Sequence, residues 1–339
     1  MKMNKKKGKQ TVYFENDIYI ASCANVAGKK EGEGPLGKYF DYVMPNAEWG
    51  EKTWEKTESK MQKYAAEHAV HNANMGFGDL SYVFAGDLLN QCIAAGFAFR
   101  ESNVPFFGIY GACSTFGETV SLASMLLDGG FGENILAVTS SHFCTAERQY
   151  RNPLEYGGQR TPTAQWTVTG AGAAVLSTRI KGFAKINGIT TGKIVDLGIK
   201  DANNMGAAMA PAAVSTIKAH FEDTGLSPDY YDLILTGDLG ALGKEIAADM
   251  LKNEKLDISK NYDDCGCMIF DAEKQDMHSG GSGCGCCASV FTGYIAEKMR
   301  KGELKKILLV PTGALLSTTS SLQGESIPSV AHAVSVEAV

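Results

Sequence analysis

An internal repeat constrains the fold of this chain more than any other sequence feature. Residues 80–91 and residues 231–242 each contain an apolar run of β character followed by Gly-Asp-Leu. Residues 133–139 and 305–311 form a second pair of apolar runs, and a glycine-rich helix start precedes each of them. The order strand, helix, strand therefore occurs twice, which predicts two copies of one α/β unit.

The two copies predict a fold of two pseudo-symmetric halves. Helix candidates at residues 52–71 and 210–223 precede the Gly-Asp-Leu strands. Strands that alternate with helices form mostly parallel sheets flanked by helices, and near-continuous apolar runs are typical of strands covered on both faces. We place the boundary after residue 180, which gives an N-terminal half over residues 1–180 and a C-terminal half over residues 181–339.

Composition and charge exclude several classes of protein. The 339 residues are 44% hydrophobic and 21% charged, as in a globular chain. Five of the 32 basic residues are lysines within residues 1–10, and the remaining 27 face 38 acidic residues, a charge of −11. Binding to nucleic acid requires a basic face, so no nucleic-acid partner is expected. The basic start is expected to be solvated or, alternatively, to touch an anionic surface.

Two features bear on the compartment in which the chain works. No stretch reaches the roughly 18 consecutive apolar residues of a membrane-spanning helix, and the lysine-rich start leads into polar sequence rather than into the apolar core of a signal peptide. We therefore expect neither an export signal nor a membrane span. Nine cysteines, an odd number with several closely spaced, favour reduced thiols over a disulfide framework.

Five of these cysteines cluster in the second half. Cys265 and Cys267 are separated by one residue, as are Cys284 and Cys286, and Cys287 follows directly. Structural zinc sites usually have more residues between paired cysteines. Packing as small apolar side chains is therefore favoured over a metal site or a redox switch.

Cys113 is the first candidate for chemistry. It lies in the sequence Gly-Ala-Cys-Ser-Thr at residues 111–115, a turn that opens a helix. Backbone N–H groups and the positive end of the helix dipole at such a position lower the pKa of a thiol and make it nucleophilic. The alternative interpretation is that Cys113 is a small residue that fits a tight helix start.

These features resemble the thiolase fold shared by thiolases and ketoacyl synthases. Residues 168–177 are similar to the glycine-rich final strand of the first half in ketoacyl synthase III enzymes. Over nearly the whole chain, nine phrases in order resemble the stage V sporulation protein AD family of spore-forming bacteria. These phrases lie at residues 85–91, 111–115, 139–142, 146–149, 155–159, 209–213, 263–266, 280–284 and 312–317.

The resemblance implies a function that the composition does not show. It implies a non-catalytic protein that binds dipicolinic acid, pyridine-2,6-dicarboxylate, and works with membrane proteins of the stage V sporulation A operon when the forming spore takes up the acid with calcium. No cofactor is implied except Ca²⁺ carried with the ligand. The resemblance also implies a homodimer, as is usual for thiolase-like folds, located peripherally at the inner membrane of the forespore or spore.

The fold that the resemblance implies predicts one ligand site. Ligands of such sheets bind beyond the carboxyl ends of the strands, where Cys113, His142 and Asp87 are expected to face the same cavity. Oxygen ligands such as Asp87 would matter more if the calcium chelate is the form that binds. Asp238 occupies the equivalent place in the second copy, so one aspartate could serve the pocket while the other caps a helix.

A planar dianion needs donors for both of its carboxylates. Helix N-terminal N–H groups at the cysteine turn would hold one carboxylate, and a bidentate arginine would hold the other. Arg148, Arg151 and Arg160 are the candidates, although loop arginines also form surface ion pairs. Asp201 and Met209, near the start of the second long helix, are further candidates for the border of the pocket.

An acyl-transfer enzyme that uses Cys113 is the alternative function. Such a cysteine needs a base and oxyanion donors, much of which the second half of the thiolase fold supplies. Thiolases carry Gly-His-Pro-x-Gly-x-Ser-Gly, whereas here Ser282 follows His278 one residue too early. Residues 312–321 contain neither a second catalytic cysteine nor an asparagine, and His332 lies in an apolar run typical of a packed core. A structural adaptor without a pocket is the third hypothesis.

Overall fold

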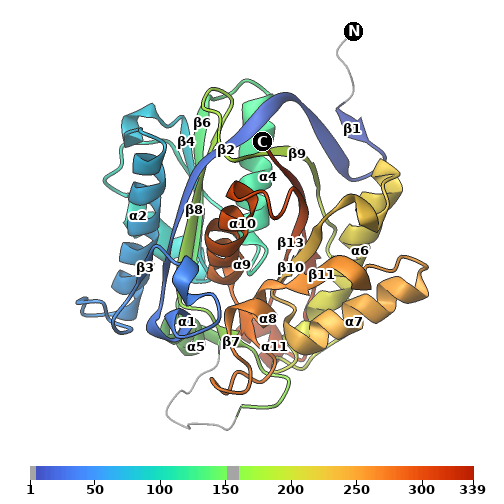
Figure 1. The fold of residues 1–339 in the computed structure, drawn as a ribbon. Helices are drawn as coiled ribbons and strands as arrows, with labels where there is room; N and C mark the ends of the chain where they lie inside the picture. Colours follow the sequence, from blue (N-terminus) through green and yellow to red (C-terminus); the bar gives the residue numbers. More distant parts are fainter. Residues whose placement is uncertain (1–4, 151–159) are drawn as a thin grey trace.

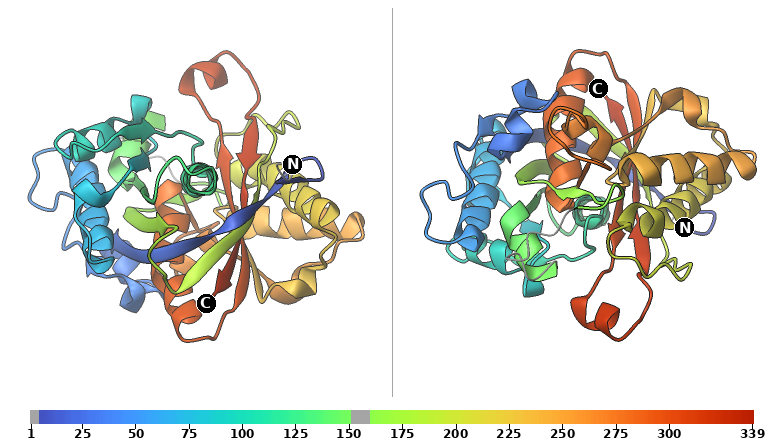
Figure 2. Two further views of the ribbon diagram at one scale, coloured as in Figure 1. Left: turned by 90° about the horizontal axis from the view of Figure 1, so that it is seen from above. Right: turned by 90° about the horizontal axis from the view of Figure 1, so that it is seen from below.

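Three layers of helices alternate with two layers of strands in this protein (Figure 1). The computed structural model describes residues 5–150 and 160–339. Helix α2 (Trp54–Asn72) covers one outer face and α6 (Met205–Thr224) covers the other, and the two lie on opposite sides of the molecule in both views of Figure 2. Between the strand layers lie α4 (Thr115–Asp128) and α9 (Cys284–Val290), each in contact with strands.

The first half contributes five main strands to one array. Three of them run parallel, and the fourth is antiparallel to both of its neighbours. Their order across the array is β5 (Phe106–Gly108), β4 (Tyr82–Gly86), β6 (Asn134–Ser141), β8 (Gly170–Ser177) and β2 (Thr11–Ala27).

The second half repeats this order. Three strands again run parallel and the fourth is antiparallel to both neighbours. The order is β11 (Tyr262–Asp264), β10 (Leu233–Gly237), β13 (Lys306–Ala314), β15 (Ala333–Ala338) and β9 (Ala184–Thr190). Strands β2 and β9 pair in antiparallel fashion and so join the two arrays. The boundary that we placed after residue 180 falls between β8 and β9.

The predicted α/β architecture of two similar halves is confirmed, with mixed rather than mostly parallel sheets. Continuous apolar runs indicate strands covered on both faces, but they do not distinguish parallel from antiparallel neighbours. All eight residues of β8 are buried, for example. A Cβ at Gly172 of this strand would lie 2.5 Å from the backbone of Ala288 in α9. Glycine therefore lets the central helix approach the sheet.

Both long helix candidates are helices in the structure. Helix α6 begins at Met205, earlier than predicted, because the Asn204 side chain caps it by accepting the Ala207 N–H at 3.3 Å. No helix within residues 5–150 and 160–339 is both long and apolar enough to cross a bilayer. The shorter elements are β1 (Lys6–Lys7), α1 (Lys29–Gly32), β3 (Tyr42–Val43), α3 (Ile93–Phe99), α5 (Phe143–Tyr150), β7 (Trp166–Thr167), α7 (Gly240–Asn253), α8 (Cys265–Ile269), β12 (Gly281–Ser282), a π-helical turn (Phe291–Ile295), α10 (Ala296–Arg300), α11 (Thr318–Leu322) and β14 (Ser329–Ala331).

The basic start of the chain is docked onto the body from residue 5 onward. Asp223 in the last turn of α6 accepts the N–H groups of three consecutive residues, 9–11, at 2.7 to 2.9 Å. The Lys5 ammonium lies 2.7 Å from the Asp128 carboxylate at the end of α4. For these residues the expectation of a merely solvated tail is wrong, because two helix ends hold them in place.

Candidate functional site

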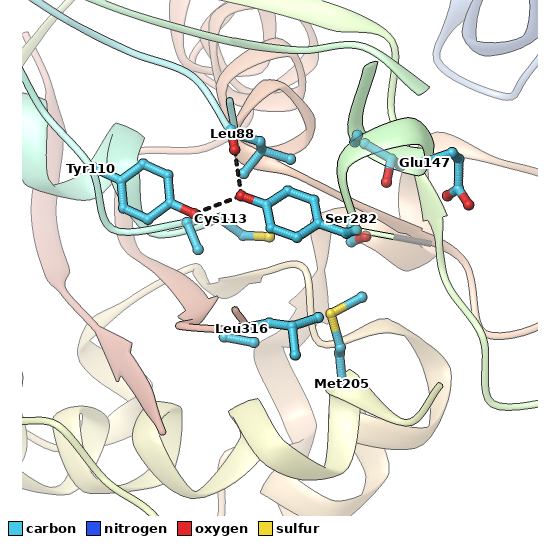
Figure 3. A pocket seen from close by; sticks show the side chains of 12 residues that line it. Leu88, Tyr110, Cys113, Glu147, Met205, Ser282 and Leu316 are labelled. Carbon is cyan, nitrogen blue, oxygen red and sulfur yellow. Dashed lines mark hydrogen bonds between the residues drawn. The ribbon is translucent and has the colours of Figure 1, made fainter. Parts of the chain in front are cut away.

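A cavity of about 50 Å³ lies where the two halves meet, at the carboxyl ends of β4, β6 and β13 (Figure 3). Eight of its lining residues come from the first half and four from the second, so both halves are needed to form it. The lining residues are Leu88, Tyr110, Ala112, Cys113, Ala146, Glu147, Tyr150, Thr167, Met205, Ser282, Ala314 and Leu316.

A tight turn places Cys113 in this cavity, as predicted from its sequence. Ala112 has a φ of 52°, a left-handed conformation that residues with a Cβ rarely adopt. On the facing strand β13, a Cβ at Gly313 would lie 2.0 Å from the Gly111 carbonyl oxygen and 3.1 Å from the Cys113 nitrogen. The strained turn and this glycine let the second half pack directly against the cysteine.

The electrostatic surroundings of Cys113 differ from the prediction. Burial, which leaves the residue 8% exposed, raises the pKa of its thiol well above the ordinary value, and the Asp238 carboxyl beside it raises that pKa further. The Gly283 N–H lowers the pKa but does not compensate for burial. Desolvation by the second half thus outweighs the helix start, and the thiol is protonated at neutral pH.

No histidine lines the cavity, although all six lie within the described residues. His278 is bound to the Thr161 carbonyl oxygen at 2.7 Å and to the Asp276 carboxylate at 3.1 Å. His332 is buried, as its apolar surroundings predicted, and its Nε2 lies 3.3 Å from Glu118. The cavity therefore offers Cys113 no imidazole base.

His142 does not face the cavity, which corrects our prediction. Its Nε2 donates to the Ala47 carbonyl oxygen at 2.9 Å and its Nδ1 accepts the Cys144 N–H at 3.2 Å. Burial lowers the pKa of the ring, so it is neutral in this pairing. Both ring nitrogens are occupied, and the residue anchors the start of α5.

The two equivalent aspartates have different surroundings. Asp87 is buried and accepts the N–H groups of Leu89 and Ala95, both at 2.8 Å, so it organises the start of α3 and does not line the cavity as predicted. Asp238 lies beside Cys113 instead, with a strained φ of 95°. Neither of its oxygens accepts a hydrogen bond of ordinary geometry from a described residue. Burial and the nearby Asp264 raise the pKa of Asp238 far above its usual range.

The arginine candidates do not line the cavity where the structure describes them. Arg148 forms an ion pair with Glu55 at the start of α2 and lies over the Trp54 ring at 5.5 Å. Arg160 binds Asp276. Arg151 lies outside the described residues. Among the described lining residues there is no arginine, lysine or histidine, so the predicted bidentate clamp is not formed by Arg148 or Arg160.

The remaining two candidates also lie away from the cavity. Asp201 is exposed and accepts the Asn203 N–H at 2.9 Å, a local turn interaction. Met209 is fully buried in the hydrophobic core under α6. Met205, one helical turn earlier, lines the cavity in its place.

Three polar residues of the lining, Tyr110, Glu147 and Tyr150, were not predicted from the sequence. The Tyr110 and Tyr150 hydroxyls are 2.8 Å apart, and Tyr150 also donates to the Leu88 carbonyl oxygen (dashed lines in Figure 3). Two signals could have found these residues. Tyr110 immediately precedes the cysteine turn, and Glu147 and Tyr150 share one face of a short helix through their spacing of three.

The second cysteine cluster is a packed core. Burial is complete at four of its members and raises the pKa of their thiols. Within residues 5–150 and 160–339, no group of three histidine, cysteine, aspartate or glutamate side chains is arranged to hold a metal ion. The four fully buried members are Cys265, Cys284, Cys286 and Cys287.

Comparison with known structures establishes the fold. The chain is similar to 3-oxoacyl-[acyl-carrier-protein] synthase III from Aquifex aeolicus, with a TM-score of 0.60, 15% identity, and 95% of this chain and 99% of that chain covered. It is similar to OleA of Xanthomonas campestris, with a TM-score of 0.61, 16% identity, and 96% and 99% covered. At these identities the similarity shows the fold alone, and it confirms the predicted thiolase-like fold.

Comparison of sequences establishes the family. The family model of stage V sporulation protein AD (SpoVAD) matches residues 8–337. The stage V sporulation protein AD of Bacillus subtilis is 46% identical over 330 residues, with 97% of each chain covered. This chain therefore belongs to the stage V sporulation protein AD family.

Proposed function

We propose that this protein binds dipicolinic acid, as its calcium chelate, in the cavity over Cys113 and does not catalyse a reaction on it. The observation that carries the proposal is a cavity with a protonated thiol and no described cationic side chain in its lining. A dianion would be desolvated there without a counter-charge, at high cost in free energy. Calcium cancels that charge, and Glu147, the carboxylate in the described lining, suits a calcium-bearing ligand.

The chemistry of the site supports binding over acyl transfer. A nucleophilic cysteine needs to become a thiolate, and a general base usually takes its proton. Here burial and Asp238 oppose ionisation of Cys113, and none of the six histidines lines the cavity. The lining offers apolar walls and the hydroxyl groups of tyrosine, serine and threonine, as in many sites for small aromatic ligands.

Isothermal titration with dipicolinic acid, with and without calcium, tests this proposal. We expect saturable heat in the presence of calcium, with an affinity that is roughly micromolar or weaker, because a protein that hands on its ligand has to release it. Cys113→Ala removes the thiol from the cavity and should weaken binding at least several-fold. Cys144→Ala is the matched control, because this half-buried thiol does not line the cavity.

Two results would count against the proposal. Absence of heat in both conditions, with the wild-type protein folded, would show that the cavity does not take this ligand. Transfer of an acyl group from an acyl thioester to Cys113 would instead support the condensing-enzyme alternative, since it requires the thiol to react.

The proposal includes the partners that the family resemblance implies. These are the membrane proteins of the stage V sporulation A operon, with this protein placed peripherally at the inner membrane of the forespore or spore. Membership of the stage V sporulation protein AD family supports this placement. Co-purification of the protein with spore inner membranes, lost in a strain that lacks those partners, is the expected result.

We also propose that the protein is a homodimer that forms through the free edge of β5. This edge strand exposes Phe106 and Phe107, and Phe97 of the adjacent α3 is 54% exposed. An exposed, aromatic strand edge is a template for pairing with another strand. Phe107→Asp should convert the dimer to a monomer in light scattering, whereas Ile194→Asp, an exposed apolar position in the other half, should not.

A further inference from the structure

The cavity is separated from a larger groove by a small set of side chains. The outer groove has a volume of about 420 Å³ and is lined by residues of three segments, 90–91, 149–150 and 315–319, together with Tyr110. Tyr110, Tyr150 and Leu316 line both the groove and the inner cavity. These three side chains therefore form the partition between the groove and the space over Cys113.

The inner cavity is too small for the proposed ligand in this state. A volume of about 50 Å³ accommodates about three or four water molecules. A pyridine ring with two carboxylates has about a dozen non-hydrogen atoms and needs more room than this. Part of the partition has to move before such a ligand can reach Cys113.

The two tyrosine hydroxyls and the Leu88 carbonyl oxygen form a chain of hydrogen bonds with one direction. Each phenol carries one proton, and a carbonyl oxygen only accepts. Tyr150 donates its proton to the Leu88 carbonyl oxygen, so in the 2.8 Å contact between the phenols Tyr110 is the donor and Tyr150 the acceptor. In this closed arrangement neither hydroxyl has a proton left to donate to a ligand.

Tyr110 is the partner that is free to move. Tyr150 is held by its bond to Leu88, and the adjacent Gln149 side chain accepts the Asn90 N–H at 3.0 Å and donates to the Leu88 carbonyl oxygen at 3.2 Å. Tyr110 is 44% exposed, and its hydroxyl has no described partner other than Tyr150. Swinging Tyr110 outward therefore breaks one hydrogen bond and leaves α5 in place.

We propose that Tyr110 is a ligand-binding residue that covers the cavity and, on ligand entry, donates its hydroxyl proton to a carboxylate oxygen of the ligand instead of to Tyr150. The inference depends on the proposed function for the ligand and adds the residue that recognises its carboxylate. The exchange conserves the number of hydrogen bonds made by Tyr110. It favours aromatic ligands that carry a carboxylate over apolar ligands of the same shape, because an apolar ligand would give the displaced Tyr110 hydroxyl no acceptor.

Two phenylalanine variants and calcium dipicolinate as the probe test the donor role. Tyr110→Phe keeps the ring and removes the donor, so affinity should fall about tenfold or more, the usual effect of losing a hydrogen bond to a charged group. Tyr19→Phe is the matched control and should bind as the wild type does, because the Tyr19 hydroxyl donates to Asp17 at 3.0 Å and lines neither the cavity nor the groove. Wild-type affinity in Tyr110→Phe would overturn the donor role while leaving the proposed function intact.

A second measurement tests the closing role without dipicolinate. Iodoacetamide alkylation of Cys113, followed by peptide mass spectrometry at one pH, should be several-fold faster in Tyr110→Ala than in the wild type. Cys144 serves as the internal reference within each sample. Unchanged labelling of Cys113 would show that Tyr110 does not close the cavity. Faster labelling in a protein that does not bind dipicolinate would support the closing role and reject the proposed ligand.

Discussion

Leu316→Trp is expected to abolish the binding of dipicolinate. Leu316 is half-buried and lines both the inner cavity and the outer groove, so an indole at this position fills the route to Cys113. We expect a loss of at least roughly 100-fold in affinity, equivalent to about 2.7 kcal/mol. Titration calorimetry measures the loss, and a thermal melt shows that the variant is folded.

Leu322→Trp is the matched control for this prediction. Leu322 lies in α11 on the same projecting loop, visible in both views of Figure 2, but it is 90% exposed and does not line the cavity. This variant should bind as the wild type does. If a folded Leu316→Trp also bound with wild-type affinity, the ligand would have to lie outside the cavity over Cys113.

The sequence specified the halves and the central cysteine because both are encoded locally. A repeated order of strands and helices predicts two similar halves, and this prediction does not require knowledge of contacts between distant residues. The turn at residues 111–115 likewise places Cys113 at a helix start through its own composition. The protonation state of this thiol was not predictable in the same way, because the second half, through Asp238 and β13, supplies the burial that raises its pKa.

The neighbours of Cys113 could not be predicted because the strand pattern does not show which polar groups already have partners. Asp87 and His142 both follow strands, as predicted. The Asp87 carboxylate, however, accepts the N–H groups of Leu89 and Ala95, and the His142 ring donates to the Ala47 carbonyl oxygen. The cap at Asp87 was one of the two roles that the sequence left open, whereas the bond from His142 to Ala47, 95 residues earlier, has no sequence signature. The prediction that Met209 borders the cavity was wrong by one helical turn, since Met205 lines it instead. Predicted helix boundaries commonly shift by several residues.

Glu58→Gln is expected to make the protein more stable above neutral pH. Glu58 of α2 is completely buried, and burial together with the nearby Asp87 raises the pKa of its carboxyl. The Thr145 hydroxyl donates to one carboxyl oxygen at 2.7 Å and the Ser140 hydroxyl donates to the other at 3.2 Å. These bonds lower the pKa but do not compensate for burial.

The sign of the pH dependence follows from this shift. An acid whose pKa is raised on folding contributes stability that is complete below its unfolded pKa and is lost as pH rises toward its folded pKa. In that window the free energy of unfolding should fall by about 1.4 kcal/mol per pH unit because of this group. Glutamine cannot ionise, so Glu58→Gln should remove this loss, and urea unfolding at several pH values measures it.

The geometry makes glutamine a close substitute at this position. Its amide N–H can donate to the Thr145 oxygen while the Thr145 proton is used on the His142 carbonyl oxygen, and its own carbonyl oxygen can accept the Ser140 hydroxyl, now 3.2 Å from Glu58. The two proteins should therefore be about equally stable at acid pH and diverge as pH rises. Glu67→Gln, an exposed change on the same helix, should not alter the pH dependence.

Parallel pH profiles for Glu58→Gln and the wild type would show that Glu58 is ionised in the folded protein. The Thr145 and Ser140 hydroxyls would then be the donors that stabilise the buried carboxylate. The result bears on the ligand site because Glu58 holds Thr145 in the first turn of α5, and Ala146, Glu147 and Tyr150 of this helix line the cavity. Ionisation of Glu58 places a charge in the core beneath this wall at a cost in free energy. Dipicolinate binding by the wild type should therefore weaken at alkaline pH, and that by Glu58→Gln should not.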